Sequence, residues 1–95
     1  MAPPEAAAVP AAAVDNAELV RSLPTGMTLD AAKTRLEGAV AAADPPLERR
    51  QAKRLAAAIA EVGARSGSDQ TKVFALEFAV IEIAGPIFLK GVFAR

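Results

Sequence analysis

Hydrophobic residues are concentrated near the C-terminal end of this chain. The segment from Val73 to Phe93 is almost unbroken apolar sequence and contains three charged residues, Glu77, Glu82 and Lys90. A helix that is apolar on every side must lie inside a bundle, against another chain or in lipid. The pattern predicts a helix that ends near Ala84. Gly85-Pro86 then breaks or kinks it before a short apolar tail.

Two earlier segments show helical spacing of apolar residues. Thr28 is a suitable N-cap for a helix that carries Leu29, Ala32 and Leu36 on one face and ends at Asp44-Pro45-Pro46. The next helix is expected from Pro46 to about Arg65, with Asp44 as its cap. Its apolar stripe contains Ala52, Leu55, Ile59 and Val62. A Pro-containing turn between two such helices predicts an αα-hairpin with small residues along its seam.

The remaining boundaries follow from capping and turn residues. Ser68 or Asp69 can cap the C-terminal helix, and Asp15 or Asn16 can cap a short helix that ends at Ser22. Residues 1–14 mix Ala with three Pro residues and predict an extended or disordered arm. The predicted fold is therefore all-α: a small helical bundle, made of the hairpin and the apolar C-terminal helix, in residues 15–95, preceded by the Ala/Pro-rich N-terminal arm.

Composition excludes several classes of function. The 95 residues include no Cys and no His, so thiolate or imidazole metal ligands and the usual base of nucleophilic catalysis are missing. Eleven basic residues balance eleven acidic ones, and there is no Trp or Tyr, which argues against nucleic acid as a partner. The Gly residues match no nucleotide-binding loop. We expect no enzyme activity, no catalytic or metal-binding residues and no cofactor.

Two charged features are candidates for a role in binding. Arg49, Arg50, Lys53 and Arg54 fall close together on one helix and would form either a docking patch for acidic groups or a solvated face. Glu77 and Glu82 are five residues apart and lie on different sides of a helix, so they do not form a paired acid and base. Either each reaches water or a Lys or Arg at the edge of the bundle, or at least one is buried beside a cation of a partner or binds an ion or cofactor.

The sequence predicts that the protein binds other proteins and does not catalyse a reaction. We expect a non-catalytic interaction or scaffold subunit that docks its apolar C-terminal helix against other protein chains, either its own copies or those of a larger assembly. The predicted partner interface comprises Phe74, Leu76, Phe78, Val80, Ile81, Ile83 and Phe88.

The alternative is an accessory subunit of a membrane complex. The 17 residues from Val73 to Leu89 are just long enough to span a bilayer, but two Glu and the Gly-Pro break oppose this. The chain shows no secretory signal or transit peptide, which favours a location in a cell or organelle over secretion.

Overall fold

The computed structural model describes the backbone of residues 11–94 and the side chains of residues 15–94. This part of the chain forms five α-helices and no strand, which confirms the all-α prediction. The helices are α1 (Ala11–Arg21), α2 (Leu29–Ala42), α3 (Arg49–Ala64), α4 (Asp69–Ala84) and α5 (Pro86–Phe93).

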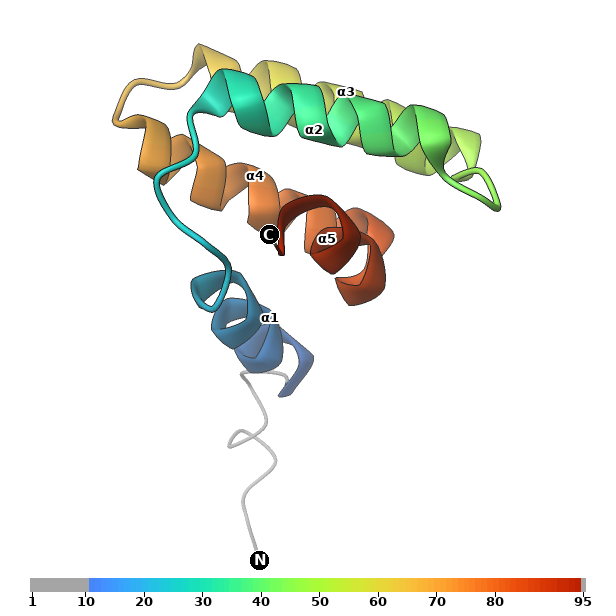
Figure 1. Ribbon diagram of the computed structural model, residues 1–95, viewed down its shortest axis with the longest axis horizontal. Helices are drawn as coiled ribbons and strands as arrows, with labels where there is room; N and C mark the ends of the chain where they lie inside the picture. Colours follow the sequence, from blue (N-terminus) through green and yellow to red (C-terminus); the bar gives the residue numbers. More distant parts are fainter. Residues whose placement is uncertain (1–10, 95) are drawn as a thin grey trace, which may run out of the picture.

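Helix α4 is the centre of the bundle. Figure 1 shows α2 and α3 side by side and antiparallel in one layer, with α4 beneath them and α5 folded back beside α4. Helix α4 packs against each of the other four helices, and most extensively against α3. Its charged residues are few and its apolar residues surround it, as expected for a helix covered on nearly all sides.

The chain's own helices cover the apolar face of α4. The buried core draws on every helix and on the α1–α2 connection: Val20, Leu23, Ala32, Leu36, Leu55, Val62, Val73, Leu76, Val80, Ile81, Leu89, Val92 and Phe93. The Ala-rich helices do not enclose α4 by themselves. Helix α5 turns back over the core and contributes three of its buried residues.

Local capping determines where two of the helices begin. The Thr28 hydroxyl accepts a hydrogen bond from the Ala31 amide at 3.1 Å, and the Ser68 hydroxyl accepts one from the Thr71 amide at 3.2 Å. Both predicted caps are therefore confirmed, and they satisfy amides that a helix start leaves without a partner.

Helix α3 begins three residues later than predicted. Asp44-Pro45-Pro46 lies in the connecting loop, with a cis Asp44-Pro45 peptide bond, and Glu48 is the N-cap. The Gln51 Oε1 accepts a hydrogen bond from the Glu48 amide at 2.9 Å, as in a capping box. The Gln51 Nε2 donates to the Ile83 carbonyl of α4 at 3.2 Å, so one side chain secures the start of α3 and joins it to the end of α4.

Helix α1 begins earlier than predicted. Residues 11–14, which were assigned to the extended arm, form its first turn, so the predicted caps Asp15 and Asn16 lie inside the helix. An Ala-rich run has high intrinsic helix propensity, and this outweighs the preference of Asp and Asn for the cap. Residues 1–10 of the predicted arm lie outside the described residues.

Side chains at the start of α4 hold the connection between α1 and α2. The Gly26 amide donates to the Gln70 Oε1 at 2.8 Å, and the Leu29 amide donates to the Asp69 Oδ2 at 3.0 Å. Each bond joins residues at least 40 positions apart in the sequence. The starts of α2 and α4 therefore lie next to each other.

Gly85 forms the corner between α4 and α5. Its φ of 94° lies in the region that L-residues with side chains rarely adopt, and Pro86 occupies the first turn of α5, where its missing N–H costs nothing. The predicted break is present, but the residues after it form a helix rather than a tail. In α5 the side chains of Leu89, Val92 and Phe93 face the core at helical spacing.

Candidate interaction surfaces

The predicted interface residues divide into a buried and a partly buried group. Leu76, Val80 and Ile81 belong to the chain's own core and are 0–4% exposed. Their side chains pack in the core of this chain, and the prediction that they anchor a partner stays a prediction. The other four, Phe74, Phe78, Ile83 and Phe88, are partly buried and pack against the core. Only these four retain surface that a partner could cover.

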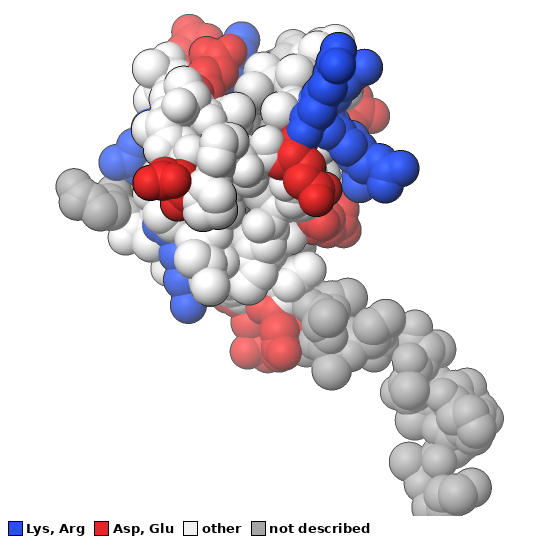
Figure 2. Space-filling view, turned by 90° about the vertical axis from the view of Figure 1, so that its right-hand side faces the viewer, with Lys and Arg blue, Asp and Glu red and all other residues white. Residues whose placement is uncertain are grey.

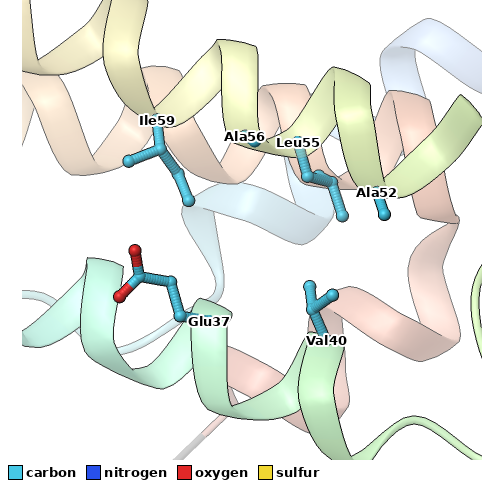
Figure 3. A pocket seen from close by; sticks show the side chains of 6 residues that line it. All are labelled: Glu37, Val40, Ala52, Leu55, Ala56 and Ile59. Carbon is cyan, nitrogen blue, oxygen red and sulfur yellow. The ribbon is translucent and has the colours of Figure 1, made fainter. Parts of the chain in front are cut away.

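An open groove lies between α2 and α3. It has a volume of about 220 Å³ and is lined by Glu37, Val40, Ala52, Leu55, Ala56 and Ile59. Figure 3 shows Val40 facing Leu55 and Ala52 across the groove, while the carboxylate of Glu37 points across it toward Ile59. The two helices of the hairpin approach each other at few positions. Ala residues on α3 leave this space because their side chains end at Cβ.

Helix α3 has a different environment on each side. With 100° between successive residues, Leu55 and Val62 point into the core, and Ala52 and Ala56 point toward the groove with α2. The opposite side carries Arg54 and lies along α4. Here a second hollow of about 440 Å³ is lined by Arg54, Ala57, Ala58, Glu61, Ala79, Glu82 and Ile83. Helix α3 is thus packed along one stripe and accessible on both flanks.

The basic cluster of Arg49, Arg50, Lys53 and Arg54 occupies the first turns of α3. All four residues are exposed. Within the described part of the chain the single ion pair joins Arg65 to Glu61, at 3.6 Å, so no carboxylate there pairs with the cluster. Figure 2 views the molecule from the side that is on the right in Figure 1, and several basic side chains lie together at its upper right. A helix N-terminus disfavours positive charge, so these cations do not serve the stability of α3.

Ile87 is the large apolar residue with the greatest exposure among those described. It is 86% exposed. Because Leu89, Val92 and Phe93 of α5 face the core, Ile87 points away from the bundle on the opposite side of that helix. Lys90, three residues later, is exposed and is its neighbour on the helix surface. Sequence reasoning did not identify Ile87, although the spacing of the three core residues of α5 was a usable signal.

The two carboxylates of the apolar segment lie in different environments. Glu82 is exposed and borders the hollow between α3 and α4, in agreement with a position at the edge of the bundle. Glu77 is 2% exposed, and its Oε1 has no hydrogen-bond partner among the described residues. Burial raises the pKa of the Glu77 carboxyl from about 4.5 to about 7. Glu77 is therefore buried inside the bundle and not at its edge, and it forms no ion pair with a described Lys or Arg.

One other polar side chain is incompletely satisfied in the described core. The Nη1 of Arg35 on α2 is buried without a hydrogen-bond partner. Arg35 and Glu77 carry opposite charges, but they form no ion pair within 4.0 Å. Neither residue lines the groove or the second hollow, so the two orphaned atoms do not define a binding site.

No described helix has the length and apolar character needed to cross a membrane. Residues 15–94 also place no three Asp or Glu side chains together in a way that could hold a metal ion. Comparison of this chain with models of protein families, with curated protein sequences and with solved structures gave no match.

Proposed function

We propose that this protein is a non-catalytic interaction subunit that binds other protein chains. The observation that carries the proposal is the open groove between α2 and α3. A small helical domain gains stability by burying apolar surface, yet here Val40, Leu55 and Ile59 flank a space that the described part of the chain leaves unfilled. A groove between two helices, lined by aliphatic side chains, is the common receptor for an apolar anchor of a partner.

The C-terminal segment supplies a second, protruding surface. Helix α4 is largely enclosed, so the docking surface proposed for this segment is limited to the corner after Gly85, which carries the exposed side chain of Ile87. Phe88 next to it is partly buried. This corner would insert into a partner, whereas the groove would receive one.

The basic cluster would orient an approaching partner. Exposed charges at the rim of an interface mainly change the rate of association and its dependence on salt, and contribute less to the final affinity. Arg49 and Lys53 fall on the exposed side of α3 beside the groove, so they would contact acidic residues at the rim of a partner and not its apolar anchor.

Site-specific photo-crosslinking tests the proposal. A photoreactive residue at Ala56, which is exposed and lines the groove, should give discrete covalent adducts when the chain is expressed in its source cells. The matched control is the same residue at Ala64, which is exposed on α3 but lies outside the groove. Adducts at Ala56 that are absent at Ala64 support the proposal. Equal labelling at both positions, or no protein adduct at either, refutes it.

A further inference from the structure

We propose that the groove between α2 and α3 receives Ile87 of a second copy of this chain. The inference rests on the proposed function and names the partner. Both halves of the contact are present on one chain: an apolar groove that no described side chain fills, and a protruding aliphatic side chain that no described residue covers. An apolar cavity of roughly 150 Å³ holds a molecule the size of benzene. The groove, at about 220 Å³, therefore has room for the branched side chain of isoleucine.

Charge complementarity selects this occupant. Lys90 lies beside Ile87 on the exposed face of α5, and Glu37 points its carboxylate into the groove from α2. When Ile87 enters between Val40 and Ile59, Lys90 of the same copy reaches Glu37. The cations of the basic cluster fall on the α3 side and repel Lys90, so they orient the incoming helix with Lys90 toward α2.

The geometry of the contact also determines how copies assemble. The groove and the protruding residue are different surfaces of the chain, so the contact is heterologous. The exception is a dimer in which each chain inserts its Ile87 into the groove of the other. In a heterologous arrangement each added chain still presents one free groove and one free Ile87. Association then continues with concentration and does not stop at two chains.

Two complementary variants test the contact in the full chain. Ile87→Glu removes the protruding residue and keeps the groove, whereas Ala56→Arg blocks the groove and keeps the protruding residue. Both positions are exposed, so the fold should be retained, which circular dichroism checks. Light scattering across concentrations up to about 1 mM, the range in which a contact with millimolar Kd becomes detectable, then gives the mass.

The expected results are specific to this contact. The unmodified chain should rise above its mass of 9.8 kDa with concentration, and each variant alone should associate at least about tenfold more weakly. A mixture of the two variants should form a pair of twice that mass and nothing larger, because only one contact is available. The control Ala64→Arg should associate like the unmodified chain.

A charge exchange tests the orientation. Lys90→Glu and Glu37→Lys should each weaken association, and the double variant should restore it. An unmodified chain that stays at 9.8 kDa, or a variant mixture that forms no pair, overturns the inference. Crosslinks from Ala56 to a different protein, together with a monomeric chain in solution, would overturn self-association and leave the proposed function in place.

Discussion

Replacing Glu77 by Gln should stabilise the protein, and the gain should grow with pH. The carboxyl group is buried at the centre of the bundle and its pKa is raised from about 4.5 to about 7. The folded state therefore holds a proton on Glu77 between these values, while the unfolded state releases it. The contribution of Glu77 to the free energy of unfolding is fully present below about pH 4.5. It falls as the pH rises, and the loss levels off above about pH 7.

The size of the effect follows from the shift. One pKa unit corresponds to about 1.4 kcal/mol, so a shift from about 4.5 to about 7 costs about 3 kcal/mol at high pH. This is a large part of the roughly 5–15 kcal/mol by which domains are stable. Gln has nearly the shape of the protonated side chain and does not ionise. The variant should resemble the unmodified protein at pH 4.5 and exceed its stability by about 3 kcal/mol at pH 8.5.

Urea unfolding followed by circular dichroism at 222 nm measures the difference at each pH. Other carboxylates titrate in both proteins, so their contributions cancel when the variant is compared with the unmodified chain. Glu82→Gln is the matched control, because Glu82 is on the same helix but exposed. A stability difference for Glu77→Gln that stays constant from pH 4.5 to 8.5 would refute the reasoning.

Two further substitutions test the ends of the helices. Gly85→Ala should destabilise the protein by about 1–3 kcal/mol, because the φ of 94° and ψ of 168° at this corner strain any residue with a Cβ. Gly91→Ala within α5 is the control and should not destabilise the protein. Urea unfolding of both variants separates backbone strain from the effect of an added methyl group. Arg49→Ala combined with Arg50→Ala should leave the fold intact and raise stability by about 0.5–1 kcal/mol at low salt, because two cations leave a helix N-terminus. A decrease in the urea midpoint would show that these residues make contacts that stabilise α3.

Features that depend on neighbouring residues were predictable from sequence. Thr28 and Ser68 are caps because their own hydroxyls reach amides three residues later, and Gly85 ends α4 because of its own backbone freedom. The start of α3 was misplaced although a signal existed. Glu48 with Gln51 three residues later is a capping pattern, but Asp44 followed by two prolines fits a helix start as well.

Features that depend on long-range packing were not predictable. Glu77 and Glu82 look alike in the apolar segment, and which one is buried depends on where α1, α2, α3 and α5 lie around α4. The same holds for Leu76, Val80 and Ile81, which an apolar pattern alone could assign equally to a core or to an interface. The groove could not be foreseen either, because small residues indicate close packing as readily as an open space.

The central position of α4 makes the fold cooperative. Helices α1 and α3 find their main packing partner in α4, and α2 packs against α4 and α5 more than against its own hairpin neighbour α3. None of the first three helices can bury its apolar face until a helix that follows all of them in the sequence is in place. Folding therefore depends on contacts between distant parts of the chain, and the bundle should form and unfold as one unit, without a stable hairpin intermediate.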